Sequence, residues 1–195
     1  FSMPGLMGRQ MRSCTVGIVG AGKIGVRVME SLRGFGCKVL YWNRSKKSGL
    51  PGMQVSFDVL CRESDIISLH IPLTVETNHL ISREVLASMK PGTILVNTAR
   101  GGLVDTEALI DALESGHLGG AALDVVEGEA GLYHFSKMSN QIKNRSLSIL
   151  KDMPNVIVTP HMAFYTREAV PQMAQCSIDA CLCLESGTVS PWRIC

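Results

Sequence analysis

The sequence lacks any apolar run long enough to cross a membrane, because no uninterrupted stretch approaches the roughly 18 residues that a spanning helix needs. Its first residues, FSMPGLMGRQMRS, contain no apolar segment after a basic start, so we expect no signal peptide and no membrane partner. Charge of one sign is also scarce, since 19 basic and 17 acidic residues give a formal net charge of +2. Proteins that bind nucleic acid usually carry a larger or more clustered basic excess, so we expect no nucleic-acid partner.

Cysteine pairs with metal-ligand spacing are missing as well. The seven cysteines, an odd number, include no C-x-x-C pair and no cluster with histidine. Most lie in apolar stretches, where a thiol behaves as a small hydrophobic group. The sequence therefore predicts a reduced, cytoplasmic protein without a metal site. Hydrophobic residues make up 46% of the chain, which is typical of a globular protein and not of a disordered one.

The sequence does contain a regular alternation of short apolar runs with longer amphipathic segments. The short runs indicate buried strands, and the segments with apolar residues at helical spacing indicate helices. Ser82 and Asp105 are suited to cap two helices, and Pro171 fits the last helix only within its first turn. The alternation predicts an α/β fold, a doubly wound parallel sheet of the Rossmann type. The predicted strands are 14–20, 37–42, 65–71, 92–98, 119–125 and 155–160, and the predicted helices are 23–36, 55–64, 82–89, 106–116 and 167–185.

A glycine-rich turn follows the first predicted strand and opens the first predicted helix. In VGIVGAGKIG, the residues Gly20, Gly22 and Gly25 form the pattern G-x-G-x-x-G. The first glycine of such a turn makes a tight bend, the second lets a pyrophosphate approach the backbone, and the third lets helix and strand pack closely. The helix N-terminus then offers N–H groups and a positive dipole end to the phosphates. The turn predicts a dinucleotide site that also includes Lys23 and Ile24, unless the glycines serve conformation alone.

The stretch YWNRSKKSG has no carboxylate where a dinucleotide-binding fold usually has one. An acidic residue about 20 positions after the glycines normally hydrogen-bonds the adenine ribose. Here the end of the second predicted strand carries Asn43, Arg44 and Ser45. An amide, a guanidinium and a hydroxyl would donate hydrogen bonds to a 2′-phosphate, which a carboxylate would repel. The pattern favours NADP(H), with NAD(H) possible; the alternative is a solvated loop in a protein that binds NAD through other contacts or does not distinguish the two.

Three further motifs each place an ionisable residue at the carboxyl end of a predicted strand, where a doubly wound sheet forms its ligand crevice. Arg100 lies in VNTARGGLVD, Glu129 lies in ALDVVEGE, and His161 lies in VTPHMAFYT. Glu129 follows Arg100 by 29 residues, and His161 follows Glu129 by 32. Together with the glycine turn, these residues resemble the D-2-hydroxyacid dehydrogenase family over essentially the whole chain. Stretches such as LRGFGCKVL and MPNVIVTPHMAFYT are most similar to its D-lactate dehydrogenase branch, which includes the vancomycin-resistance enzymes.

The resemblance implies hydride transfer between NADP(H) or NAD(H) and a small 2-oxo or D-2-hydroxy acid, with pyruvate and D-lactate as the first candidates. His161 would be the general acid and base, because imidazole has an ordinary pKa of roughly 6.5. Glu129 would hydrogen-bond the far ring nitrogen and favour the imidazolium form. Arg100 would hold the substrate carboxylate and polarise the carbonyl group.

The resemblance also assigns contacts outside this triad. Asp124 would lie near the nicotinamide amide, unless it is a structural or helix-capping aspartate. Tyr165, with Phe164, would contact the substrate side chain, unless both rings pack in a core. The residues implied for the adenine and nicotinamide-ribose sides of the cofactor are His70, Pro72, Thr77, Thr98 and Ala99.

The family pattern also predicts how the chain is divided. Family members insert the nucleotide-binding domain between two halves of a substrate domain, and Gly20 comes so early here that we expect the substrate domain to be largely missing. We expect residues 1–13 to be a lead-in segment, 14–165 the dinucleotide-binding domain with the catalytic residues, and 166–195 a C-terminal helix and tail that return to the substrate domain. Such a chain would bind the dinucleotide but turn over poorly alone, because closure of the cleft supplies positioning and excludes water.

Family members dimerise through this domain, so the expected partners are a small 2-oxo or 2-hydroxy acid and a second copy of the chain. The long polar connection 127–145, EGEAGLYHFSKMSNQIKNR, is expected to contribute to that contact or to the active-site rim. A second class of function stays open. A non-catalytic, dinucleotide-sensing scaffold of the corepressor type shares the fold and can keep the same three residues.

Overall fold

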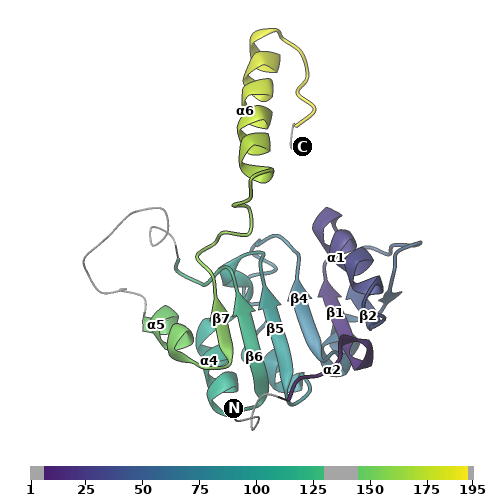
Figure 1. Ribbon diagram of the computed structural model, residues 1–195, viewed down its shortest axis with the longest axis vertical. Helices are drawn as coiled ribbons and strands as arrows, with labels where there is room; N and C mark the ends of the chain where they lie inside the picture. Colours follow the sequence, from purple (N-terminus) through teal and green to yellow (C-terminus); the bar gives the residue numbers. More distant parts are fainter. Residues whose placement is uncertain (1–6, 130–144, 193–195) are drawn as a thin grey trace. The chain divides into compact units, whose positions relative to one another are not determined.

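A computed structural model of the chain describes residues 7–129 and 145–192 (Figure 1). The chain divides into two compact units, Phe1–Pro160 and His161–Cys195. Among the described residues, no helix is long and apolar enough to cross a membrane, and no group of three or more His, Cys, Asp or Glu side chains is arranged to hold a metal ion. The domain boundaries expected from the family pattern remain a prediction.

The first unit is built on a seven-stranded sheet in which every neighbouring pair of strands is parallel. The order is β3-β2-β1-β4-β5-β6-β7, so the chain starts centrally, moves out to β3 and returns to the other side of β1. The winding therefore reverses between β1 and β4, where a sheet of this kind opens its ligand crevice. The predicted doubly wound parallel sheet is confirmed. The strands are β1 (Thr15–Val19), β2 (Lys38–Trp42), β3 (Met53–Gln54), β4 (Ile66–Leu69), β5 (Thr93–Asn97), β6 (Leu118–Leu123) and β7 (Val156–Val158).

Helices connect most of the strands, and the two predicted caps are confirmed. Ser82 accepts a hydrogen bond from the N–H of Val85 at the start of α3, and Asp105 accepts one from Ala108 at the start of α4. Such a cap contributes roughly 1 kcal/mol, because it satisfies an otherwise unpaired N–H group. The helices of this unit are α1 (Lys23–Arg33), α2 (Phe57–Glu63), α3 (Arg83–Ser88), α4 (Thr106–Glu114) and α5 (Arg145–Asp152), with 3₁₀ turns η1 (Met11–Ser13) and η2 (Gly101–Leu103).

The core of the first unit is divided between the two faces of the sheet, because successive side chains of a strand point in opposite directions. Val16 and Ile18 of β1 are buried beneath α1, around the fully buried Met29. On the opposite face, a Cβ atom added to Gly17 would lie 2.7 Å from Cδ2 of Leu60, so α2 packs directly on the strand. Helices α2, α3, α4 and α5 all contribute to this second, larger cluster. In Figure 1, α1 lies beside β1 and β2, and α4 and α5 lie beside β6 and β7.

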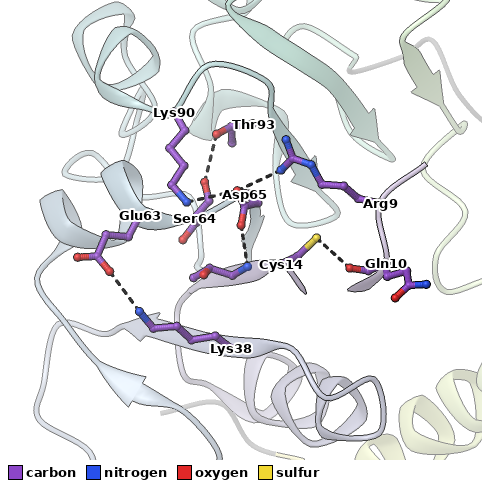
Figure 2. A network of polar contacts seen from close by, with 10 residues as sticks. Arg9, Gln10, Cys14, Lys38, Glu63, Ser64, Asp65, Lys90 and Thr93 are labelled. Carbon is purple, nitrogen blue, oxygen red and sulfur yellow. Dashed lines mark hydrogen bonds and ion pairs between the residues drawn. The ribbon is translucent and has the colours of Figure 1, made fainter. Parts of the chain in front are cut away.

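A polar network joins the amino ends of three strands, at the edge of the sheet opposite the crevice (Figure 2). The carboxylate of Asp65 accepts hydrogen bonds from the N–H of Thr15 at 2.8 Å, from Arg9 Nη1 at 3.2 Å and from Lys90 Nζ at 3.3 Å. Burial by itself would raise the pKa of Asp65, but these bonds and the two nearby cations lower it below its ordinary value. The network therefore holds an ionised carboxylate at the start of β4.

The second unit contains the helix α6 (Ala169–Glu185), which is 17 residues long. Pro171 lies in its first turn, where a missing N–H costs nothing, as the sequence predicted. No residue of α6 is buried, and Met173, Ile178 and Leu182 are each more than half exposed.

Candidate functional site

The turn between β1 and α1 lies where the winding of the sheet reverses. Gly20 has a φ of +103°, a conformation that residues with a Cβ atom rarely adopt. A Cβ atom on Gly22 would meet no other atom within 4 Å, whereas one on Gly25 would lie 2.0 Å from the carbonyl oxygen of Gly20. A tight bend, an open backbone and a close helix contact are the three features that a pyrophosphate-binding turn needs. Lys23 and Ile24, the next residues of α1, are exposed.

The N-terminus of α1 is left open by the sequence. Its N-cap residue is Gly22, which has no side chain to accept a hydrogen bond from the first turn. Helices α2, α3 and α4 begin instead behind Ser56, Ser82 and Asp105, and each of these side chains caps its helix. The leading N–H groups of α1, an 11-residue helix, are therefore left to solvent or to a ligand. The positive end of the helix dipole at this position suits an anion such as a phosphate.

The loop after β2 is held against the glycine turn by Asn43. The side-chain oxygen of Asn43 accepts a hydrogen bond from the N–H of Ala21 at 3.1 Å. Its amide nitrogen donates to the carbonyl oxygen and to the hydroxyl of Ser45, both at 3.0 Å. The amide nitrogen of Asn43 thus donates its hydrogen bonds within the loop, which the sequence pattern did not indicate. The guanidinium of Arg44 and the hydroxyl of Ser45 remain exposed beside the turn.

The loop after β4 faces the crevice from the other side of the reversal. The N–H of His70 donates to the carbonyl oxygen of Val19 at 2.8 Å, and its Nε2 atom hydrogen-bonds the hydroxyl of Ser68 at 2.9 Å. Burial lowers the pKa of His70, so its ring is neutral at pH 7. The hydroxyl of Thr77 donates to the carbonyl oxygen of Pro72 at 2.8 Å and closes the loop on itself.

These two loops carry opposite charges that interact. The pKa of Glu76 is lowered first by the hydrogen bond from the hydroxyl of Thr74, at 2.6 Å, and also by the cation of Arg44. Arg44 from the loop after β2 therefore lies near Glu76 from the loop after β4. The crevice of a doubly wound sheet lies between loops in these two positions.

Arg100 is held at the carboxyl end of β5 by Asn97, a residue that the sequence reasoning missed. Asn97 is 1% exposed, donates to the carbonyl oxygen of Arg100 at 2.9 Å and accepts from the N–H of Ala99 at 3.0 Å. Its own carbonyl oxygen accepts from the N–H of Asp124 at 2.9 Å, which ties β5 to the loop after β6. The signal for Asn97 was an amide at the end of an otherwise apolar strand, next to the exposed Thr98.

The guanidinium of Arg100 is available to an anion. The residue is exposed, its Nη1 atom donates to the carbonyl oxygen of Ala99 at 2.7 Å, and it takes part in none of the ion pairs within the described part of the chain. A planar, permanently charged fork in this position can bind a carboxylate through two parallel hydrogen bonds.

Asp124 and Glu129 lie on the loop after β6, at the same edge of the sheet. Asp124 is 5% exposed and accepts a hydrogen bond from the hydroxyl of Thr159 at 2.5 Å. The Oε2 atom of Glu129 accepts from the N–H of Val126 at 2.7 Å, so the carboxylate folds back on its own loop. A Cβ atom on Gly101 would lie 2.2 Å from the carbonyl carbon of Val126. The turn that follows Arg100 and the loop that carries Glu129 are therefore in direct backbone contact.

The predicted site residues are divided between the two units. The glycine turn, the loop after β2, Arg100 and Glu129 belong to the first unit and lie at the carboxyl ends of its strands. His161 is the first residue of the second unit and has a φ of +49°. Tyr165 is 70% exposed, and its ring contacts that of Phe164 edge to face, with ring centres 6.1 Å apart. The pairing of His161 with Glu129 remains a prediction.

Comparisons with known proteins agree with this arrangement. A family model described as "D-isomer specific 2-hydroxyacid dehydrogenase, NAD binding domain" matches residues 1–163. The chain is 48% identical over 178 residues to a D-specific alpha-keto acid dehydrogenase from Enterococcus faecium, over 91% of this chain and 55% of that protein. It is 41% identical over 201 residues to an aromatic 2-oxoacid reductase from Clostridium sporogenes, over 100% of this chain and 60% of that protein.

Solved structures show the same likeness. The crystal structure of a D-lactate dehydrogenase with NAD+ from Lactobacillus jensenii matches with a TM-score of 0.92 and 34% identity, over 100% of this chain and 59% of that one. The chain thus spans between half and two thirds of the length of the relatives named here.

Proposed function

The chain belongs to the D-isomer specific 2-hydroxyacid dehydrogenase family, and from that membership we propose that it binds a nicotinamide dinucleotide and interconverts a small 2-oxo acid and a D-2-hydroxy acid. The resemblance found in the sequence is thereby confirmed at the level of the family. The observation that carries the proposal is the turn between β1 and α1, where an open Gly22 meets an uncapped helix N-terminus. Pyruvate and D-lactate are our first candidates for the pair of acids.

The residues at this edge of the sheet fit a dinucleotide. The backbone of Gly22 leaves room for a pyrophosphate, with Lys23 and Ile24 beside it. When bound, the dinucleotide supplies a hydride to the 2-oxo carbon or accepts one in the reverse direction. Asp124 is our choice for a contact with the nicotinamide amide. The residues that we assign to the adenine and nicotinamide-ribose sides are His70, Pro72, Thr77, Thr98 and Ala99.

Three side chains carry the remaining steps in this proposal. Arg100 binds the carboxylate of the acid with its two parallel N–H groups and polarises the 2-oxo group. His161 donates a proton to the 2-oxo oxygen as the carbon gains a hydride, and it takes the proton back in the reverse reaction. Glu129 hydrogen-bonds the far nitrogen of His161 and favours its charged form. Tyr165 contacts the side chain of the acid.

Dinucleotide oxidation in the presence of pyruvate or phenylpyruvate tests this function. We expect a D-configured product, and we expect Arg100→Gln to lower kcat/KM by roughly 100-fold without changing dinucleotide affinity, because a charge-assisted pair contributes about 2–3 kcal/mol. Arg83→Gln is the matched control, since Arg83 pairs with Asp111 between α3 and α4. Dinucleotide binding without any turnover, in this chain and in a longer form, would contradict the proposal and favour the non-catalytic scaffold.

We infer that the loop after β2 favours NADP(H) over NAD(H). Arg44 and Ser45 are the exposed donors of this loop, while Asn43 fixes its conformation. The 2′-phosphate would compete with Glu76 for the guanidinium of Arg44. Both cofactors remain in use in this proposal, with NADP(H) bound more tightly.

Fluorescence titration with NADPH and NADH tests this preference. We expect Arg44→Ala to weaken NADPH binding by roughly tenfold and to leave NADH binding almost unchanged, since a hydrogen bond to a charged group contributes about 1.5–3 kcal/mol. Glu76→Gln should strengthen NADPH binding, because it removes the competing carboxylate. Lys46→Ala is the matched cation control on the same loop. Equal affinity of the unmodified chain for both dinucleotides would contradict the proposed preference for NADP(H).

We further propose that full turnover requires the part of the relatives that this chain does not match. Closure of a cleft positions the reactants and excludes water, and these effects lower a barrier by several kcal/mol. This chain should therefore bind the dinucleotide yet reduce pyruvate at least 100-fold more slowly than a full-length relative in the same assay. Comparable turnover numbers would overturn this part of the proposal.

The proposed assembly is a homodimer through this domain, in the cytoplasm. The proposal rests on the family resemblance, since the connection 127–145 that we assigned to the contact falls largely on residues 130–144, outside the described residues. Sedimentation velocity at micromolar concentration tests it. A single species of the monomer mass, 21.1 kDa, over the whole concentration range would contradict it.

A further inference from the structure

One contact between two loops at the carboxyl edge of the sheet involves none of the residues to which we assign a contact with the dinucleotide or the acid. His79, in the loop after β4, places Nε2 at 2.7 Å from Oε1 of Glu127, in the loop after β6. The two side chains are 38% and 41% exposed, so the contact is shielded on part of its surface. It joins segments 48 residues apart in the sequence.

The backbone of His79 has a strained conformation, which contacts with neighbouring residues must hold in place. Its φ is +50°, and His161 is the only other residue with a side chain that has a positive φ in the described part of the chain. A left-handed backbone is unfavourable for a residue with a Cβ atom and persists only where neighbouring contacts fix it. The N–H of His79 donates to the carbonyl oxygen of Gly102 at 2.8 Å. His79 is therefore fastened by its backbone to the turn that follows Arg100 and by its ring to the loop of Glu129.

Glu127 forms the other half of this contact, on the loop after β6, and its backbone also lies against the turn that follows Arg100. The backbone N–H of Glu127 lies so close to Gly101 that a Cβ atom on the glycine would be 2.5 Å away. One residue earlier, the N–H of Val126 donates to the carboxylate of Glu129. Fixing the side chain of Glu127 therefore fixes the short segment on which Glu129 folds back.

We propose that His79 and Glu127 form a positioning pair, which holds the loop that carries Glu129 against the turn that follows Arg100. Neither side chain contacts the acid or gives up a proton to it; both act through the segments that they join. That the pair affects turnover rests on the proposed function. That the pair holds the two loops together does not depend on that function. A displacement of about 1 Å in a catalytic group costs up to 100-fold in rate.

Amide hydrogen exchange tests the fastening without any assay of activity. In Glu127→Ala we expect exchange at least tenfold faster at Val126, Glu129 and Leu103, with unchanged exchange in β1 and β4. Glu127→Gln keeps an oxygen that accepts from Nε2, so it should restore most of the protection. His79→Asn, which tolerates a positive φ but is too short to reach Glu127, should match Glu127→Ala.

A control is offered by His117, whose Nε2 atom hydrogen-bonds the carbonyl oxygen of Leu86 at 3.1 Å, away from these loops. His117→Ala should leave exchange at the three reporter amides unchanged. Equal protection of the reporter amides in the unmodified chain, in Glu127→Ala and in His79→Asn would overturn the proposal that His79 and Glu127 hold these loops together.

Steady-state kinetics test the effect on the reaction. We expect Glu127→Ala to lower kcat roughly tenfold with an unchanged KM for the dinucleotide, and Glu127→Gln to stay within about threefold of the unmodified chain. Loosened loops with an unchanged kcat would overturn the positioning role. Absence of turnover in both the unmodified chain and a longer form contradicts the proposed function instead, and the exchange result then decides the pair by itself.

Discussion

Each of the three glycines in the turn after β1 meets a different environment, and substitution should separate their effects. A Cβ atom on Gly22 would enter open space, so Gly22→Ala should change the free energy of unfolding by less than about 0.5 kcal/mol. The added methyl group would nevertheless stand where we place the pyrophosphate, and dinucleotide affinity should fall at least tenfold. A Cβ atom on Gly25 would lie 2.0 Å from the carbonyl oxygen of Gly20, so Gly25→Ala should destabilise the chain by roughly 1–3 kcal/mol.

Urea unfolding and fluorescence titration of the two variants check this prediction. The pair acts as its own control, because both substitutions add one methyl group to the same turn. If Gly22→Ala bound the dinucleotide as tightly as the unmodified chain, the pyrophosphate could not lie at this turn.

Ser64 is a second residue whose environment makes a sharp prediction. Its hydroxyl is the one buried side-chain polar atom without a hydrogen-bond partner in the part of the chain that the structure describes. An unpartnered buried hydroxyl costs about 1–3 kcal/mol, so Ser64→Ala should leave the stability unchanged or raise it. Figure 2 shows the neighbouring Thr93, whose hydroxyl donates to the carbonyl oxygen of Ser64 at 3.2 Å.

Thr93→Val provides the contrast, since it replaces a hydrogen-bonded hydroxyl with a methyl group of similar size. We expect it to lower the free energy of unfolding by about 1 kcal/mol. Urea midpoints of both variants, measured at one pH, give the two free energies. A loss of more than about 1 kcal/mol in Ser64→Ala would show that its hydroxyl has a partner after all.

At the scale of single residues, the positions of the candidate site residues could be predicted from the sequence, whereas their hydrogen-bond contacts could not. The spacing from the glycines led to Asn43, because the length of a strand–helix–strand unit is nearly fixed. It did not reveal that the amide of Asn43 bonds within its own loop, since that depends on the path of the chain after β2. Asn97 was missed for a similar reason: its role follows from hydrogen bonds to Arg100 and Asp124 that only the packed loops create.

At the scale of whole elements, Asp65 joins the starts of β1, β4 and β5 and should make their association depend on pH. Its pKa is lower in the folded chain than in the unfolded chain, so the unfolded chain binds the proton more tightly. The stabilisation is therefore present above the ordinary carboxyl pKa and is lost as the pH falls through the lower, folded value. The difference in the free energy of unfolding between the unmodified chain and Asp65→Asn should be largest near pH 7 and shrink in acid.

Urea unfolding of both chains between pH 7 and pH 3 measures this difference. Glu63→Gln is the matched control, because Glu63 forms a half-exposed pair with Lys38 at 3.3 Å and should contribute little. A constant difference between Asp65→Asn and the unmodified chain over this range would contradict the assignment.

Elements with a strong pattern were predicted from the sequence, and elements without one were not. All five helices and six strands expected from the sequence are present, with ends within a few residues, because most of them have apolar residues at helical spacing or a β-branched run. The strand β3 is only two residues long and takes its place by pairing with β2, so no local pattern marks it. The helix α5 begins at Arg145, where a polar stretch still dominates, and is identified by the burial of Leu147 and Leu150 against the core.

At the scale of the whole molecule, the proposed functions divide between the two units. In our proposal, dinucleotide binding requires the turn, the loops and the helix end of the first unit, whereas proton transfer requires His161, the first residue of the second. Binding and reduction should thus be separable by truncation. Binding should persist wherever the first unit is folded, and reduction should need both units together.

A chain that ends at Pro160 should fold as stably as the chain of 195 residues. Every residue of the two core clusters lies before Thr159, and α6 buries none of its residues. Removing 161–195 therefore leaves both clusters complete, and we expect the free energy of unfolding in urea to change by less than about 1 kcal/mol. Dinucleotide affinity should also be retained, while the far-ultraviolet signal loses the contribution of α6.

Leu150→Ala in the longer chain calibrates this measurement, because Leu150 is fully buried and its truncation should cost about 2–5 kcal/mol. A truncated chain as unstable as Leu150→Ala would mean that the second unit supports the core of the first. In that case the weak dinucleotide binding of the truncated chain would report unfolding, and the separation of binding from reduction would have to be sought by substituting His161 alone.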